Sequence, residues 1–137
     1  MTVDAEGERL GLTVGTFVPL SLVPPLVGIS IAREAAMHEL LRAAGGFAVS
    51  VLAADQDAVA QHFARGVPPI AHWHRIAHRE GSHGAPLLEG AIGWLECRTC
   101  ADHEVGDHTF FVGEVLASTL GEARPPLLYL DRRYRPL

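Results

Sequence analysis

The sequence lacks the features that mark several large classes of protein. Only 2 of its 137 residues are cysteines, too few for a disulfide framework, and no signal peptide is recognisable, so we expect a reducing cytoplasm. The apolar segment Phe17–Ala32 is too short to span a bilayer and contains three prolines, which argues against a membrane partner. With 11 basic residues against 16 acidic ones and no basic cluster, nucleic acid is not an expected partner either.

Motifs for several kinds of chemistry are also missing. Neither a G-x-G-x-x-G stretch nor a P-loop is present, which argues against a Rossmann dinucleotide site and an NTPase, and no G-x-S-x-G elbow supports a hydrolase. The 8 histidines invite a metal hypothesis, best represented by His72-x-His74 and by the Cys97, Cys100 and His103 series. In a strand, Cys97 and Cys100 would point to opposite faces, so we expect no metal site, a buried Cys97 and a Cys100 in a turn.

What is present fits one globular domain over residues 1–137. Hydrophobic residues make up 48% of the chain and charged ones 20%, and a chain of this length buries about two thirds of its unfolded surface. Periodicity predicts helices over Glu34–Ala44, ended by Gly45-Gly46, and from Asp55 to about Arg65, with a loop over Gly66–Pro86. Strands are predicted at Leu10–Leu22, Leu26–Ile31, Phe47–Leu52, Gly90–Thr99, His108–Thr119 and Leu127–Leu130, with an extended connection at Pro24-Pro25 and a polar turn over residues 101–104.

The predicted strands outnumber the helices, and some are apolar on both faces. In the stretch after His108, Phe110 and Val112 would lie opposite Phe111 and Val115. A closed barrel whose outer wall is covered by helices or by a second subunit explains such strands. The residues alone therefore favour a mainly β barrel.

One turn stands out as a candidate site. Gly106-Asp107-His108 combines a residue that allows positive φ, a carboxylate that can bond the local backbone, and an imidazole at the mouth of a strand. His108 could orient a ligand there. The residues alone, however, favour the plainer interpretation of a strand-entry histidine that faces water.

A series of short motifs, in order along the chain from about residue 10, resembles the short-chain flavin reductases. These proteins are the reductase partners of two-component flavin monooxygenases. The matching motifs are Gly11–Phe17, Ser21–Val27, Gly46–Leu52, Gln61–Ala64, Pro86–Ala91, Trp94–Cys97, Gly106–His108, Val112–Val115, Pro126–Tyr129 and Arg133–Tyr134.

This resemblance implies a fold and an activity. The fold would be the FMN-binding split β-barrel, a Greek-key-like barrel of six strands with two or three short helices. Such a barrel would bind FMN or FAD at a homodimer interface, take hydride from NADH or NADPH, and supply reduced flavin to a monooxygenase component.

The resemblance also implies roles for particular residues. Thr13–Phe17 would lie along the flavin ring, with Gly15 and Thr16 in place of the family's usual Ser-Ser pair. Arg33 and the start of the following helix would face the flavin phosphate, and His108, the candidate catalytic residue, would sit beside the flavin and nicotinamide rings. The expected flavin-binding residues are Thr13, Val14, Gly15, Thr16, Phe17, Ile31, Ala32, Arg33, Ser50 and Phe63.

Departures from the family pattern keep a second hypothesis open. Glu34-Ala35-Ala36-Met37 replaces a hydroxyl-rich stretch at the expected phosphate site and adds a carboxylate. Leu130 replaces a frequent histidine, and the resemblance places Met1 inside the first strand, without the family's N-terminal helix. The alternative is a reductase-like barrel that has lost or repurposed its flavin site, as a non-redox biosynthetic enzyme or a small-molecule-binding protein.

Overall fold

A computed structural model describes the backbone of residues 1–137 and every side chain except those of Pro69 and Pro136. Two α-helices, α1 (Ala36–Ala44) and α2 (Asp57–Ala64), accompany a mainly β chain with one 3-10 turn, η1 (Pro69–Ala71). The strands are β1 (Thr2–Ala5), β2 (Glu8–Gly11), β3 (Val18–Leu22), β4 (Pro25–Ala32), β5 (Gly46–Val51), β6 (His78–Glu80), β7 (Pro86–Leu88), β8 (Gly93–Val105), β9 (His108–Leu120), β10 (Leu127–Leu130) and β11 (Arg133–Pro136). Neither α-helix in this described chain has the length and apolar character needed to cross a membrane.

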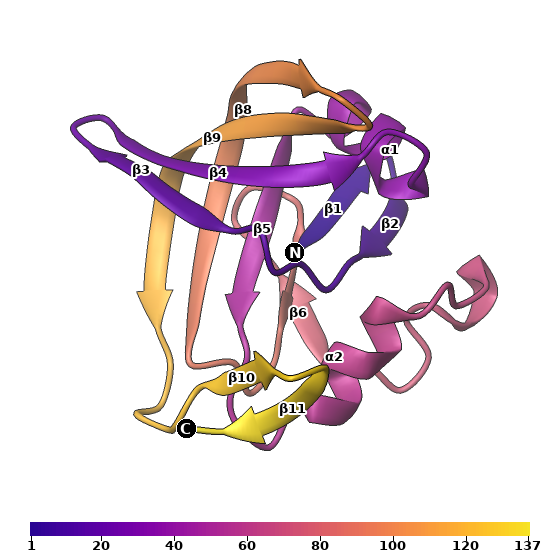
Figure 1. The fold of residues 1–137 in the computed structure, drawn as a ribbon, viewed down its shortest axis with the longest axis vertical. Helices are drawn as coiled ribbons and strands as arrows, with labels where there is room; N and C mark the ends of the chain where they lie inside the picture. Colours follow the sequence, from indigo (N-terminus) through magenta and orange to yellow (C-terminus); the bar gives the residue numbers. More distant parts are fainter.

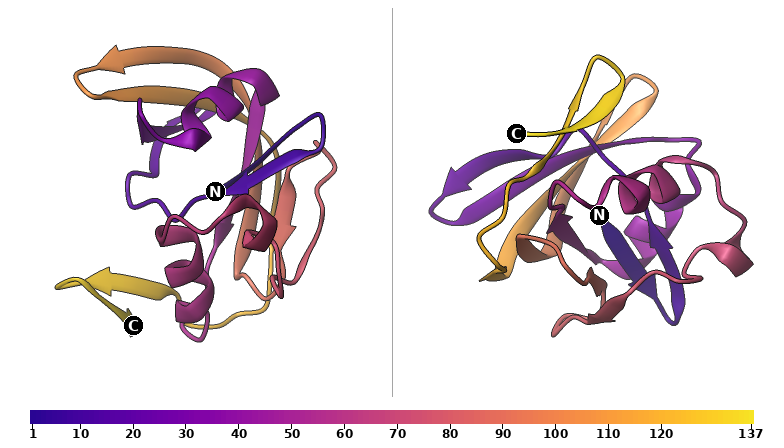
Figure 2. Two further views of the ribbon diagram at one scale, coloured as in Figure 1. Left: turned by 90° about the vertical axis from the view of Figure 1, so that its right-hand side faces the viewer. Right: turned by 90° about the horizontal axis from the view of Figure 1, so that it is seen from below.

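One curved antiparallel sheet dominates the fold (Figures 1 and 2). Its seven strands follow the order β2-β1-β5-β8-β9-β4-β3, where six strands were expected. The two end strands, β2 and β3, are consecutive in the chain and joined by residues 12–17, yet in the described structure they do not pair with each other. The sheet therefore curls into a barrel with a split, and the predicted fold class, mainly β with short helices, is confirmed.

The core lies inside this curved sheet and beneath α1. Ile29, Phe47 and Phe111, from three strands, are fully buried with Leu41 of α1. The helix buries Met37, His38, Leu40 and Leu41, the spacing expected of an amphipathic helix. It ends at Gly45, whose φ of +66° is the left-handed conformation that glycine adopts without strain.

Three predictions of local structure were wrong. The expected strand Leu10–Leu22 is interrupted between Gly11 and Val18, because residues 12–17 leave the sheet to contact α2 and β4. The expected loop Gly66–Pro86 contains η1 and β6, a three-residue strand too short to show a period. The expected turn at residues 101–104 continues β8, and the chain reverses at Gly106-Asp107, where Val105 pairs with His108.

The connection at Pro24-Pro25 also differs from the prediction. Instead of an extended link it is a tight turn between β3 and β4, with a cis peptide bond between Val23 and Pro24. The resulting β3–β4 hairpin projects from the body of the molecule (Figure 1). Its position leaves the apolar side chains at its tip in solvent.

Candidate functional site

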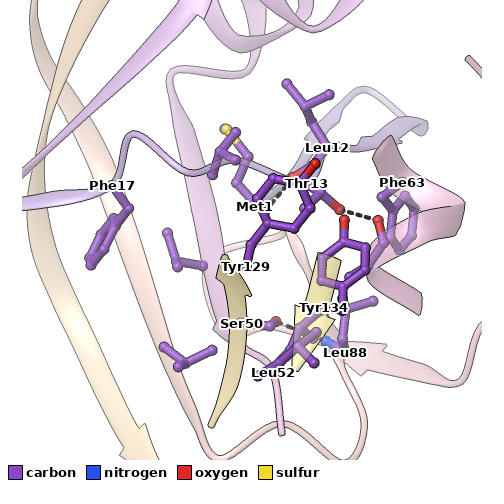
Figure 3. A pocket seen from close by; sticks show the side chains of 15 residues that line it. Met1, Leu12, Thr13, Phe17, Ser50, Leu52, Phe63, Leu88, Tyr129 and Tyr134 are labelled. Atoms are coloured by element: carbon purple, nitrogen blue, oxygen red, sulfur yellow. Dashed lines mark hydrogen bonds between the residues drawn. The ribbon is translucent and has the colours of Figure 1, made fainter. Parts of the chain in front are cut away.

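A pocket of about 230 Å³ opens where residues 12–17, strand β5, helix α2 and the C-terminal hairpin β10–β11 meet. Figure 3 shows this pocket, with two tyrosine side chains rising from the hairpin toward Thr13 and Phe63. Most of its wall is apolar. The lining residues are Met1, Leu12, Thr13, Val14, Phe17, Val49, Ser50, Val51, Leu52, Ala60, Phe63, Leu88, Leu127, Tyr129 and Tyr134.

The hydroxyl groups of Thr13 and Thr16 anchor the segment of residues 12–17 near its two ends. Thr13 Oγ1 donates a hydrogen bond to the Ala60 carbonyl at 2.6 Å, and the Thr13 amide donates to the Phe63 carbonyl at 3.3 Å. At the other end, Thr16 Oγ1 donates to the Ser30 carbonyl at 3.0 Å and accepts from the Ser30 amide at 3.1 Å. Val14 and Gly15, between these anchors, belong to no strand, so their peptide groups are not used in the sheet.

Two other predicted residues are held on the pocket wall. Ser50 Oγ accepts a hydrogen bond from the Leu88 amide at 3.1 Å, which fixes the hydroxyl at the surface of the pocket. Phe63 is buried against Gly11, where a Cβ atom would lie only 2.4 Å from the ring. Glycine at position 11 therefore allows the close approach that seats this ring.

A second group of predicted residues lies where β4 ends and β9 begins. Ala32 pairs with His108, and the Arg33 amide donates to the Asp107 carbonyl at 2.9 Å. His108 Nδ1 lies 2.7 Å from Asp107 Oδ1, and this hydrogen bond lowers the pKa of the Asp107 carboxyl. The imidazole is thus oriented by its neighbour while its side chain remains 41% exposed.

Arg33 lies shortly before helix α1 in the chain. Its guanidinium is half-exposed and only loosely paired, 3.9 Å from the Glu104 carboxylate. The helix begins after Ala35, whose side chain has no group that could accept a hydrogen bond from the first helical amides. A half-exposed, loosely paired guanidinium beside an uncapped helix N-terminus is a favourable place for an anion.

The predicted residues therefore fall into two groups. Thr13, Val14, Phe17, Ser50 and Phe63 share the pocket. Ala32, Arg33 and His108 share the end of the β4–β9 pair, while the Ile31 side chain is buried in the core and could meet a ligand only through its backbone. The bonds between Thr16 and Ser30 connect the two groups, with Gly15 just before them.

Tyr129 and Tyr134 were not among the predicted site residues. Tyr129 and Tyr134 face each other across the hairpin, with ring centroids 4.9 Å apart and an interplanar angle of 49°. Burial raises the pKa of the Tyr134 hydroxyl, with a smaller contribution from Tyr129. The signal in the sequence was their spacing, because residues two positions either side of a two-residue turn become cross-strand partners.

The cysteines do not converge. Cys97 is buried as predicted, and burial, aided by Glu96, raises the pKa of its thiol to about 12. The prediction of Cys100 in a turn was wrong, since it is exposed within β8 and its thiol lies 3.4 Å from the Val112 carbonyl. The offset of three residues places the two thiols in different surroundings, as expected for a strand.

Comparison with known proteins places this geometry in a family. The chain belongs to the flavin reductase like domain family, whose model matches residues 1–137. It is 42% identical to the NADH-dependent FAD reductase of Streptomyces globisporus, over 98% of this chain and 75% of that protein. It is also 42% identical to the reductase component of 4-hydroxyphenylacetate 3-monooxygenase from Thermus thermophilus, over 95% of this chain and 80% of that protein.

A solved structure is similar over nearly the same length. It is that of the NADH:FAD oxidoreductase SgcE6 of Streptomyces globisporus C-1027 in complex with NAD and FAD fragments, with a TM-score of 0.92 and 41% sequence identity. The match covers 98% of this chain and 80% of that one. The resemblance inferred from short motifs is thereby confirmed.

Proposed function

We propose that this protein is a flavin reductase, which takes hydride from NADH or NADPH, reduces FMN or FAD, and supplies the reduced flavin to a monooxygenase. The observation that carries the proposal is the apolar pocket against residues 12–17 in a chain of this family. Relatives named as an NADH-dependent FAD reductase and as a monooxygenase reductase component support it. They favour a reductase over a barrel that has lost its flavin site.

The residues of the chain suit a flavin. A planar, largely apolar ring system can be covered by Val14, Phe17 and Phe63, while the peptide groups of Val14 and Gly15 remain available to its polar edge. Arg33 and the first amides of α1 suit a phosphate. When bound, the flavin supplies the hydride acceptor.

Each group of residues then has a task. The wall of the pocket excludes water and fixes the plane of the ring. His108, at the start of β9, is held at Nδ1 by Asp107 and keeps Nε2 available for a ligand, and we assign it the positioning of the nicotinamide against the flavin. Glu34, next to Arg33, adds a negative charge that weakens the phosphate end relative to a hydroxyl-rich sequence.

We further propose a homodimer that acts in the cytoplasm. The exposed apolar tip of the β3–β4 hairpin supports a second copy as its cover, and the exposed Cys100 thiol suits a reducing compartment. The monooxygenase partner is supported by the name of the Thermus thermophilus relative.

The test is a flavin titration followed by reduction. FMN, FAD and riboflavin are titrated while flavin fluorescence is recorded, and NADH or NADPH is then mixed with each complex in an anaerobic stopped-flow instrument. We expect at least one flavin to bind with a Kd well below millimolar and to lose its yellow absorbance on reduction. Failure of every flavin to bind below about 1 mM, which corresponds to about 4 kcal/mol, would overturn the proposal in favour of the repurposed barrel.

A further inference from the structure

A second hollow, of about 490 Å³, lies beside the apolar pocket, between helix α2 and the β10–β11 hairpin. Three arginines line it: Arg65 at the end of α2, and Arg132 and Arg133 at the hairpin turn. Asp57 is the one carboxylate among its lining residues. We refer to this hollow as the arginine groove.

The arginines of the arginine groove form no ion pair with the side chains that the structure describes. Among the side chains that the structure describes, no carboxylate lies within 4.0 Å of the guanidinium groups of Arg65, Arg132 or Arg133. Arg65 only donates to Gln61 Oε1, at 3.3 Å. The chain as a whole has a net charge of −5, so three guanidinium groups without ion pairs in one groove make the charge distribution uneven. They create a local positive potential that attracts anions.

The turn that carries two of these arginines has an unusual conformation for its residues. Asp131 and Arg132 have φ angles of +52° and +59°, in the left-handed region. Two-residue hairpin turns of this kind favour Asn and Gly, which adopt positive φ at lower cost than a long side chain. Arg132 therefore occupies a position where glycine would serve the hairpin better, which indicates a use for its charge.

The arginine groove and the apolar pocket share two lining residues. Tyr129 and Tyr134 line both hollows, so a molecule can lay an aromatic ring system against the tyrosines and extend a charged group to the arginines. Guanidinium groups match the geometry of phosphate oxygens better than other cations do. We propose that the arginine groove binds the phosphate groups of a nucleotide whose ring portion enters the apolar pocket, an inference that rests on the proposed function.

This site is separate from the one at Arg33. Figure 1 shows α1 and the hairpin β10–β11 at opposite ends of the molecule. Two anion sites at the two ends suit a protein that must hold two phosphorylated substrates at once. The phosphate in the arginine groove comes either from the nicotinamide dinucleotide or from the flavin, and the chemistry of recognition is the same for both.

The direct test uses ADP, a nucleotide with a pyrophosphate and no redox ring, titrated into the protein by calorimetry. We expect Arg132→Gln and Arg133→Gln each to weaken ADP binding by about 3- to 10-fold, since a solvent-exposed charged contact is worth less than a buried one. Arg135→Gln is the matched control, because Arg135 is exposed on the same hairpin and does not line the groove. A further variant, Arg132→Gly, should raise the thermal midpoint of unfolding, because glycine relieves the strain in the turn, and should still weaken ADP binding. If Arg132 had only a structural role, this variant would leave ADP binding unchanged.

Kinetics then identify the source of the phosphate. A higher KM for NADH or NADPH with unchanged kcat and unchanged flavin Kd assigns the groove to the nicotinamide dinucleotide. Weaker binding of FMN or FAD with unchanged riboflavin binding assigns it to the flavin. Wild-type affinity for ADP, both flavin nucleotides and both nicotinamide nucleotides in the Arg132→Gln, Arg133→Gln double variant overturns the proposal.

The ADP titration does not depend on catalysis. If ADP binds the wild type and is lost in the double variant while no flavin is reduced, the arginine groove stands and the proposed function fails. If flavin is reduced normally but ADP, FMN and NADH bind both proteins equally, the function stands and the groove proposal fails.

Discussion

At the scale of single residues, the turn at Asp107 orients the His108 side chain, as the positioning role that we propose for it requires. Asp107 holds Nδ1 at 2.7 Å, and the pairing of His108 with Ala32 fixes the backbone on which the ring is mounted. Only Nε2 is left for a substrate. An imidazole held in this way loses little freedom when it contacts a ligand, which favours a positioning role over a passive exposed histidine.

His108→Ala should therefore slow hydride transfer more than it weakens flavin binding. Loss of one preorganised hydrogen bond that acts in the transition state lowers the rate on the order of 10²-fold. The measurement is the stopped-flow rate of flavin reduction beside the flavin Kd. His103→Ala is the control, since His103 is exposed on the same β8–β9 hairpin, and an identical reduction rate in both variants would remove His108 from the site.

Arg33 should be the main protein contact of the flavin phosphate. No residue of Glu34–Met37 has a hydroxyl group that could share the phosphate charge with Arg33. Arg33→Ala should therefore weaken FMN binding by about 1 to 2 kcal/mol. This loss is smaller than for a buried charge because the guanidinium is half-exposed. Riboflavin, which lacks the phosphate, should bind equally well to both proteins. Arg42→Ala serves as a control from the far end of α1, and equal weakening of FMN and riboflavin by Arg33→Ala would show that the phosphate lies elsewhere.

At the scale of elements, helices were more predictable than short strands. Met37, Leu40 and Leu41 give α1 a clear helical period, so the predicted and observed elements differ only in their first two residues. β6 and β11 have three and four residues, too few to display alternation, and they form only because a partner strand is adjacent. The interruption of the sheet between Gly11 and Val18 could not be predicted either, because it depends on hydrogen bonds to carbonyls of α2 that are distant in sequence.

The site was predictable to the extent that it is local. Thr13–Phe17 and Gly106–His108 are contiguous stretches with distinctive composition, and both reach the candidate site. Tyr129 and the arginines near it line a hollow only when the C-terminal hairpin folds back against α2. No local sequence pattern predicts the contact between this hairpin and α2.

Within the sheet, glycine allows strands and large rings to approach. A Cβ atom at Gly113 of β9 would lie 2.6 Å from Phe47 and 3.1 Å from the Cys97 side chain, both buried in the core. Gly113→Ala should lower the free energy of unfolding by about 1 to 3 kcal/mol through overpacking, measured by urea denaturation. Gly15→Ala, where nothing lies within 4 Å of the added methyl group, should leave stability unchanged, and equal effects of the two would contradict this account of packing.

At the scale of the whole molecule, several large apolar side chains lie exposed on the surface of one chain. Leu22 and Val23 at the tip of the β3–β4 hairpin are 91% and 92% exposed, and Leu120 at the end of β9 is 90% exposed. Isolated exposed apolar side chains are ordinary. A projecting hairpin with two of them at its tip, however, is well placed to contact a second protein chain. A second copy of the chain is the simplest cover, since closed two-fold dimers are the commonest assemblies.

Sedimentation velocity at micromolar concentration should accordingly show two chains per particle. Leu22→Glu combined with Val23→Glu should shift the protein to single chains, because burying two new carboxylates at an interface costs more than the lost apolar contact alone. Ile70→Glu is the matched control, since Ile70 is 95% exposed in η1, away from the hairpin, and its replacement should leave the dimer intact. A wild type that sediments as one chain, or a double variant that remains dimeric, would mean that the hairpin tip is not where two copies meet, and the pocket would then have to bind its substrates within a single chain.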